Sequence, residues 1–328
     1  MPEEPYIRAV LASNNFVGLA GLYLLGLCAI ISSVSPYFCT NRNRRAEKRL
    51  QAKVRERSYD AISGLRGIVK EETVMAQKEY ANQTVSVIMP AYNSSAYIED
   101  SIDSVLAQTY PDWELIIVDD ASTDNTQQLV TAYQDERIRY YRNDTNRGVA
   151  ISRNRGIELA RGRYLAFLDS DDLWLPEKLT HQVAFMQKKR IGFSYHWYRQ
   201  FTTSAKQPGL LVRTKACVDY AELLKGNDIG CLTVMVDHQQ FPDILMPQQR
   251  HEDYIAWLNV LSGGGRAYSL PEDLARYRLG QGSLTSNKWK SLYWTWQVYR
   301  DAQQLPLVKS LYYMWHYISQ GLRKHHYL

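Results

Sequence analysis

Cysteine is scarce in this chain. Only four cysteines occur in 328 residues, and no two of them form a CxxC pair or part of a spaced quartet: Cys28, Cys39, Cys217 and Cys231. This spacing argues against a structural zinc site and against a disulfide framework. A reducing compartment is therefore the simpler expectation.

The chain also lacks a strong charge of either sign. Its formal net charge is +5, and much of that excess lies in the basic block 41–57 and near the C-terminus. Positive charge confined to the flank of an apolar segment and to one terminus favours a membrane surface. We therefore expect a membrane partner and no nucleic acid.

A cleavable signal peptide is absent by the usual criteria, because residues 1–8 (MPEEPYIR) are acidic and the apolar run that follows is too long. No charged residue occurs from Ala9 to Asn41, which is long enough for a transmembrane helix over about 15–37. A buried core helix is the alternative.

The basic flank after this segment predicts a single-pass protein of the inner (cytoplasmic) membrane, with the remainder facing the cytoplasm. Domain 1–40 is then an anchor and 41–83 a basic helical linker.

Apolar runs and helical patterns alternate from residue 85 onward. Strands are predicted at 85–89, where Pro90 ends the run, and at 114–118, 137–141 and 164–168. Helices are predicted at 95–108, capped by Ser94 or Ser95, from Ser122 or Asp124 to 133, and at 149–160. This repetition indicates an α/β fold with a mainly parallel sheet and right-handed crossovers.

Polar residues follow three of these strands at the points where they end, in Pro90–Ser94, Asp119–Asp120 and Asp169–Asp172. The carboxyl ends of parallel strands share one edge, where α/β sheets bind ligands. We therefore expect these three segments to meet around a ligand.

The last of the three carries three carboxylates in four residues: Asp169, Asp171 and Asp172. Such a cluster suits a hard divalent cation that brings a diphosphate with it. The alternative is a strand end followed by a helix that Asp171 caps.

Around the cluster, Asp120 could accept a hydrogen bond from a base N–H and Tyr92 offers an aromatic face. Three arginines offer phosphate contacts or, equally, solvated helix faces: Arg147, Arg153 and Arg155. Arg153 is favoured because it lies one turn into its helix on the ligand side.

Two long stretches, VSVIMPAYNSSAYIEDSIDSVLAQTYPDWELIIVDDASTDNT and NRGVAISRNRGIELARGRYLAFLDSDDLWLPEKL, resemble the nucleotide-sugar half of family 2 glycosyltransferases. That family has the GT-A fold. The later segments GNDIGCLTVM, MPQQRHEDYIAWLNVL and LARYRLGQGSLTSNK resemble its bacterial teichuronic-acid, lipopolysaccharide and capsule branch.

The resemblance implies a role for each matching residue. Asp169-Ser170-Asp171 occupies the DxD position, with Asp171 as the metal ligand, Asp169 near the ribose or as a second ligand, and Mn²⁺ or Mg²⁺ as cofactor. A UDP-sugar is the implied donor, and a glycan or lipid-linked molecule is the acceptor. The implied donor-binding residues are Pro90, Ala91, Tyr92, Asn93, Asp119, Asp120, Arg147, Gly148, Arg153, Asp169, Ser170 and Asp171.

Glu252-Asp253 matches the family's acidic pair, whose second member is the catalytic base. Displacement at the anomeric carbon with inversion needs a carboxylate that takes the acceptor's proton, and Asp253 is the candidate. A favourable charge at a helix N-terminus is the alternative for Asp253. Asp172 and His251 are further candidates at the site.

The resemblance divides the remaining chain into a nucleotide-sugar half (84–187), an acceptor half (188–280) of irregular strands and loops, and aromatic and basic helices (281–328). Gly263–Gly265 lacks the strand–helix context of a phosphate-binding loop. The Trp-, Tyr- and Lys-rich C-terminal helices suit either a core or a bilayer interface.

Two rival functions remain. A phosphohydrolase of the haloacid-dehalogenase type also begins with an apolar run and Asp-x-Asp. Its signature has Thr or Val at the position of Leu173, however, and it lies at the start of the domain, whereas here the segment follows a fourth strand. The second rival function is an inactive, membrane-tethered nucleotide-sugar sensor. The intact carboxylates at 169–172 and 252–253 argue against it.

Overall fold

The computed structural model describes residues 83–202, 205, 207, 209–279 and 288–326. All of them belong to the second of two compact units, Ala76–Leu328. The predicted transmembrane helix at 15–37 and the linker up to residue 82 lie outside the described residues. None of the helices in these ranges combines the length and the apolar composition of a membrane span.

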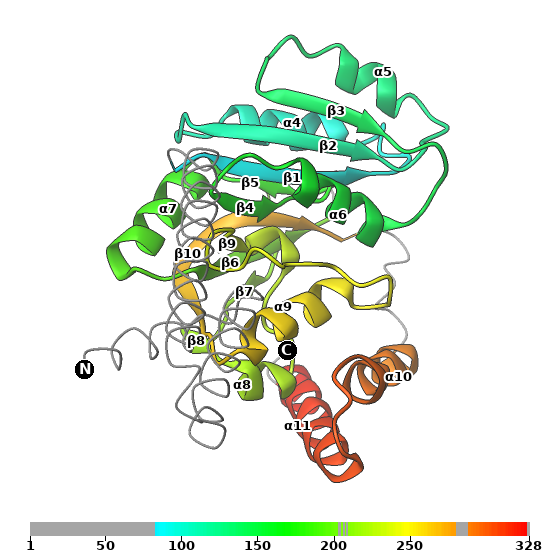
Figure 1. Cartoon of the computed structure of the whole chain (residues 1–328), viewed down its shortest axis with the longest axis vertical. Coiled ribbons are helices and arrows are strands. Elements are labelled where there is room, and N and C mark those ends of the chain that lie inside the picture. Colours follow the sequence, from blue (N-terminus) through cyan, green and yellow to red (C-terminus); the bar gives the residue numbers. More distant parts are fainter. Residues whose placement is uncertain (1–82, 203–204, 206, 208, 280–287, 327–328) are drawn as a thin grey trace, which may run out of the picture. The chain divides into compact units, whose positions relative to one another are not determined.

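Four parallel strands form the first half of the sheet: β1 (Val85–Ala91), β2 (Trp113–Asp119), β3 (Ile138–Arg142) and β4 (Tyr164–Phe167), in the order β3-β2-β1-β4. Helices α4 (Ile98–Leu106), α5 (Thr126–Thr131) and α6 (Val149–Leu159) connect them (Figure 1). β1 and β2 are buried throughout because helices cover both faces. The predicted βα repetition is confirmed.

The two faces of β1 pack into different parts of the core. Val87 and Met89 join the cluster that contains Ile98 and Ile102 of α4. Ile88 instead joins the cluster that contains Ile157 of α6. The alternation of side chains along the strand thus anchors α4 and α6 on opposite faces of the sheet.

The second half of the chain continues this sheet. β9 (Met235–Asp237) pairs antiparallel with β4 and with β6 (Phe193–Phe201), and β10 (Ala267–Arg278) runs parallel to β6. β5 (Leu173–Trp174) and β8 (Cys217–Val218) pair antiparallel with β10, and β7 (Leu211–Val212) pairs antiparallel with β6. The segment 188–280, expected to hold irregular strands and loops, contains two long strands, β6 and β10, and three short ones, β7, β8 and β9. Two register shifts interrupt the pairing of β10 with β6.

The remaining helical elements follow β4 in the chain: α7 (Lys178–Lys189), α8 (Tyr220–Leu224), a 3₁₀ turn (Cys231–Thr233), α9 (Glu252–Ser262), α10 (Lys288–Gln297), a π turn (Val298–Ala302) and α11 (Leu307–His326). Trp257 of α9 makes edge contacts with Phe167 of β4 and Phe193 of β6, with ring centroids 5.5 and 5.4 Å apart. These contacts fix α9 against the centre of the sheet.

Three local predictions are corrected. β1 continues through Pro90 to Ala91, since β4 pairs only with Val85–Ile88 and a missing N–H is tolerated beyond that point. The first helix begins at Ile98 without a side-chain cap, and Ser94 contributes its carbonyl to the preceding turn instead. No helix begins near Asp171, because β5 pairs with β10 there and α7 starts only at Lys178.

Candidate active site

The loops after β1 and β2 are joined by hydrogen bonds. The backbone N–H of Asn93 donates to Ser122 Oγ at 2.9 Å, and Asn93 Oδ1 accepts from the backbone N–H of Thr123 at 2.8 Å. Asn93 has φ +50°, a left-handed conformation that Asn tolerates better than most residues. These bonds hold Tyr92, whose side chain is exposed, at the carboxyl edge of the sheet.

Asp124 strengthens the same junction by accepting from the backbone N–H groups of Ser95 and Thr126, both at 3.0 Å. Burial opposes its charge, but hydrogen bonds from Thr126 and Ser95 outweigh burial and hold the pKa of Asp124 below its ordinary value. The ionised Asp124 side chain therefore joins the loop after β1 to the loop after β2.

Asp119 and Asp120 point to different partners. Asp119 is fully buried and accepts from the backbone N–H of Ser122, the hydroxyl of Tyr140 and the guanidinium of Arg142. Asp120 accepts from the Gly148 N–H at 2.6 Å, the Arg147 N–H at 3.0 Å and Asn143 Nδ2 at 2.7 Å. Asp120 thus shapes the loop that precedes α6, and Asp119 holds the turn after β2.

The predicted DxD segment lies directly after β4. Ser170 Oγ and Ser94 Oγ are 2.7 Å apart, so this segment meets the loop after β1. Burial and the charge of Asp169 raise the pKa of Asp171. Burial, with the charges of Asp169 and Asp171, raises the pKa of Asp172 further, and Asp172 Oδ2 is buried without a partner among the described residues.

Arg153 of α6 joins this segment to the acidic pair. Its guanidinium donates to Asp169 Oδ1 at 2.6 Å and to Glu252 Oε1 at 2.7 Å, while Arg153 is only 4% exposed. Burial opposes the charge of Arg153, but the negative charge of Asp169, joined by that of Glu252, outweighs burial and raises the pKa of the guanidinium. Residues separated by about a hundred positions in the sequence are thereby held in one cluster.

Asp253 follows Glu252 at the start of α9. Burial, and then the charge of Glu252, raise the pKa of Asp253 to about 6. His251 precedes the helix with φ +61°, its ring lies 5.8 Å from that of Trp294 in α10, and burial lowers its pKa. With a pKa of about 6, the Asp253 carboxylate can take up a proton near neutral pH.

The acidic residues near β4 suit a divalent cation. Asp169, Asp171 and Asp172 repel one another in a partly buried setting, and a hard cation with oxygen ligands would relieve that repulsion. In the described part of the chain, no three His, Cys, Asp or Glu side chains are arranged to hold a metal together. A metal that binds through substrate phosphates usually takes one or two carboxylates from the protein.

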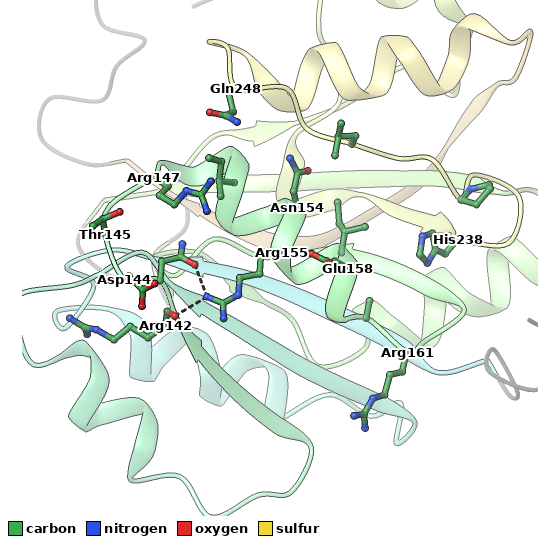
Figure 2. Close-up of a pocket in the computed structure, with 16 residues that line it drawn as sticks. Arg142, Asp144, Thr145, Arg147, Asn154, Arg155, Glu158, Arg161, His238 and Gln248 are labelled. Carbon is green, nitrogen blue, oxygen red and sulfur yellow. Dashed lines mark hydrogen bonds between the residues drawn. The ribbon is translucent and has the colours of Figure 1, made fainter.

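A cavity of about 1080 Å³ lies beside α6 (Figure 2). No residue of the acidic cluster lines it. Arg147 and Arg155 line it together with Asn154, whose side chain pairs with both backbone groups of Met246. Of the three arginines predicted to offer phosphate contacts, Arg147 and Arg155 line this cavity and Arg153 does not. The cavity adjoins the donor loop at residue 147 and the segment that leads to the acidic pair.

Arg278 is a site residue that sequence reasoning missed. At the end of β10, its backbone N–H donates to Asp172 Oδ1 at 2.8 Å and its Nε donates to the Asp171 carbonyl at 2.8 Å. Its guanidinium also stacks on Tyr97 and Phe201. The only signal in the sequence is a basic residue at the end of a β-rich run, which does not reveal the partner.

Cys231 was also missed as a neighbour of the site. It is buried, and its electrostatic neighbours are Arg153, Asp169, Asp253 and Glu252. Burial raises the pKa of its thiol well above the ordinary value, so the thiol stays neutral and acts as packing.

The sheet and its clustered carboxylates fit the class that the sequence resembles, glycosyltransferases with a GT-A-like fold, and the comparisons with known proteins show the family. Residues 86–233 match the family described as Glycosyl transferase family 2. TuaG of Bacillus subtilis, whose name refers to teichuronic acid biosynthesis, is 42% identical over 243 residues, covering 73% of this chain and 96% of TuaG. The Escherichia coli protein WfgD, a UDP-Glc:alpha-D-GlcNAc-diphosphoundecaprenol beta-1,3-glucosyltransferase, is 39% identical, covering 74% of this chain and 94% of WfgD.

Solved structures agree on the fold. The complex of S. aureus TarS with UDP-GlcNAc superimposes with a TM-score of 0.56 at 20% identity, covering 72% of this chain and 71% of that one. The Pyrobaculum calidifontis mannosyltransferase PcManGT with GDP-Man and Mn²⁺ gives 0.54 at 17% identity, covering 73% of each chain. The chain belongs to glycosyltransferase family 2, and this result sets aside the phosphohydrolase alternative.

Proposed function

We propose that this glycosyltransferase moves a sugar, with inversion, from a UDP-sugar to a lipid-linked diphosphate sugar during assembly of a bacterial surface polysaccharide. The contact that carries the proposal is the Arg153 bridge between Asp169 and Glu252, which joins the donor edge to the acidic pair. The printed activities of WfgD and WfaP, both UDP-glucose transferases acting on a diphosphoundecaprenol acceptor, support this donor and acceptor class.

In this proposal the donor lies at the carboxyl edge of β1, β2 and β4. Tyr92 packs on the base, Asp120 keeps the loop 147–148 in place, and Arg147 faces the phosphates. Asp171, with Asp169, would hold Mn²⁺ or Mg²⁺, which when bound neutralises charge on the diphosphate.

Asp253 takes the proton of the acceptor hydroxyl as the new bond to carbon 1 forms. The bond between carbon 1 and the diphosphate oxygen breaks at the same time, and its electron pair leaves with the nucleotide. Attack from the side opposite the leaving group inverts the configuration, and no covalent sugar intermediate is needed. Asp253 suits this step because its raised pKa, about 6, makes it a stronger base than an exposed carboxylate.

The test uses purified full-length protein in detergent with a panel of nucleotide sugars, Mn²⁺ or Mg²⁺, and a synthetic lipid-diphosphate GlcNAc acceptor. Product formation with one donor, lost with EDTA and restored by added metal, is the expected result. Donor binding without cleavage for every donor, with or without acceptor, would instead support the sensor alternative.

A further inference from the structure

The helix α11 has two unlike faces. Ser310 is buried, and Tyr313 and Met314 pack against the hydrophobic core around α9. The hydroxyl of Tyr317 lies 3.0 Å from Ser291 Oγ of α10. This side attaches the helix to the core around α9 and to α10.

The other face is apolar, aromatic and open. Val308 is 79% exposed and Trp315 is 70% exposed, and the exposed apolar residues recur every three or four positions: Val308, Leu311, Tyr312, Trp315 and Ile318. Isolated exposed apolar residues are ordinary, but a continuous helical stripe marks an interaction surface. We call these five residues the α11 stripe.

The composition of the segment that carries the α11 stripe favours one partner. Residues 288–326 contain six Lys or Arg and a single acidic residue, Asp301. Protein interfaces are depleted of Lys at their centres, whereas an anionic bilayer attracts basic residues that flank an apolar, Trp- and Tyr-bearing helix face. We propose that the α11 stripe lies in the interface of an anionic bilayer, parallel to its plane.

This surface is connected to the candidate site. Trp294 of α10 contacts the ring of His251, and Arg250 lies 5.3 Å from the same indole. The helix pair α10–α11 is thus in contact with the segment that precedes Glu252 and Asp253. The docking itself does not depend on the transfer reaction. Only its consequence, holding the base near a lipid-linked acceptor, rests on the proposed function.

The experiment places an environment-sensitive NBD probe at single cysteines of the full-length chain, in a background with Cys28, Cys39 and Cys217 replaced by serine. Cys231 is buried and can remain. Val308→Cys reports on the α11 stripe, and Gln134→Cys is an exposed control in the nucleotide half. The protein is reconstituted in phosphatidylcholine vesicles with or without phosphatidylglycerol, and nitroxide-labelled lipid is the quencher.

We expect a blue shift and strong quenching at position 308 in the anionic vesicles, and neither at position 134. Leu311→Glu with Trp315→Glu should lower the quenching at 308 by about tenfold, because two charges then face the acyl region. Gln128→Glu with Gln134→Glu adds the same charge elsewhere and should change nothing. All these positions are exposed, so the variants should fold.

A water-exposed probe at position 308 in anionic vesicles would overturn the proposal. So would protection without nitroxide quenching, which would indicate a second copy or another segment on the α11 stripe. Equal quenching in phosphatidylcholine alone would overturn the choice of an anionic surface. Donor cleavage by the same samples, measured in parallel, separates these outcomes from a failure of the proposed reaction.

Discussion

Arg153 shows how one side chain can position an entire site. It is nearly buried and bridges two carboxylates that belong to different halves of the chain. Burying a guanidinium is costly, and the cost is offset only because both partners accept strong, charge-assisted hydrogen bonds. Removing the arginine leaves Asp169 and Glu252 facing each other without a cation.

Arg153→Gln should therefore lower the free energy of unfolding by about 3 kcal/mol, at the lower end for a broken buried pair because both carboxylates keep some contact with water. For a domain of this size the thermal midpoint should fall by about 6–12 °C. Arg161→Gln, in an exposed arginine just beyond the same helix, is the control and should leave the midpoint unchanged. A variant as stable as the parent would show that the bridge contributes little.

Asp253→Asn keeps the shape of the proposed base and removes its charge. We expect kcat for sugar transfer to fall by about 10²–10⁴-fold, the usual contribution of a general base, while the donor Kd stays within about twofold. Asp243→Asn alters an exposed carboxylate ten residues earlier and should behave like the parent. Retained activity in Asp253→Asn would mean that another group accepts the proton.

The pKa of Asp253 also predicts a pH profile. The base must be ionised to accept a proton, and its pKa is raised to about 6 by burial and by Glu252. Activity should therefore be full above this pKa and fall by about tenfold per pH unit below it. Donor binding measured over the same range separates loss of the base from loss of the donor, and a profile that stays flat down to pH 5 would contradict the assignment.

At this scale the sequence reveals residue types but not their partners. The acidic residues 169–172 and 252–253 could be proposed from their positions after a strand and before a helix. The contacts of Arg278 with Asp171 and Asp172 could not, because they join segments more than a hundred residues apart. A lone arginine at the end of a strand carries no local signal of such a contact.

Among the elements, the turn that joins α6 to β4 is closely packed. Gly162, in the turn after α6, donates its N–H to Ser86 Oγ at 2.8 Å. A Cβ at Gly162 would lie 2.5 Å from the Thr84 carbonyl oxygen and 2.8 Å from the Ser86 nitrogen, both backbone atoms. The turn therefore has no room for a side chain.

Gly162→Ala should destabilise the protein by about 1–3 kcal/mol, because backbone atoms of β1 cannot move aside easily. Gly263→Ala is the matched control, since a Cβ there meets nothing within 4 Å. Chemical or thermal unfolding of both variants beside the parent measures the difference. Equal stability of the two variants would show that β1 adjusts without cost.

Elements formed by local patterns were predictable, and those formed by distant pairing were not. The strands β1 to β4 alternate with helices, so apolar runs and helical spacing locate them. β10 instead pairs with β6, Ser269 opposite Tyr195, and two register shifts interrupt the pairing. Its sequence contains Pro271 and four acidic or basic residues that break the strand pattern, so only the tertiary context makes it a strand.

Over the whole molecule, one sheet runs through both halves, from β3 at one end to β5 at the other. The sequence suggested a donor half and an acceptor half. It could not show that β9 joins them by pairing with β4 on one side and β6 on the other. The acidic pair on α9 therefore packs against the same sheet whose edge carries the DxD segment.

Membrane attachment by the N-terminal segment is the prediction that concerns the chain as a whole. The uncharged run from Ala9 to Asn41 is followed by a basic block, which predicts a span with the catalytic part in the cytoplasm. Each arginine placed at the centre of such a span costs about 2.5–3.5 kcal/mol of insertion free energy. Leu24→Arg with Leu25→Arg should therefore prevent stable insertion.

The measurement is the fraction of full-length protein that stays in the membrane pellet after an alkaline carbonate wash, which removes proteins held only at the surface. The parent should stay in the pellet and Leu24→Arg/Leu25→Arg should be released. The charged α11 variant Leu311→Glu/Trp315→Glu should also stay in the pellet, because an interfacial helix adds contact without anchoring. Release of the parent would contradict the span and leave α11 and the basic block as the membrane contacts. Retention of the double arginine variant would place the anchor elsewhere in the chain.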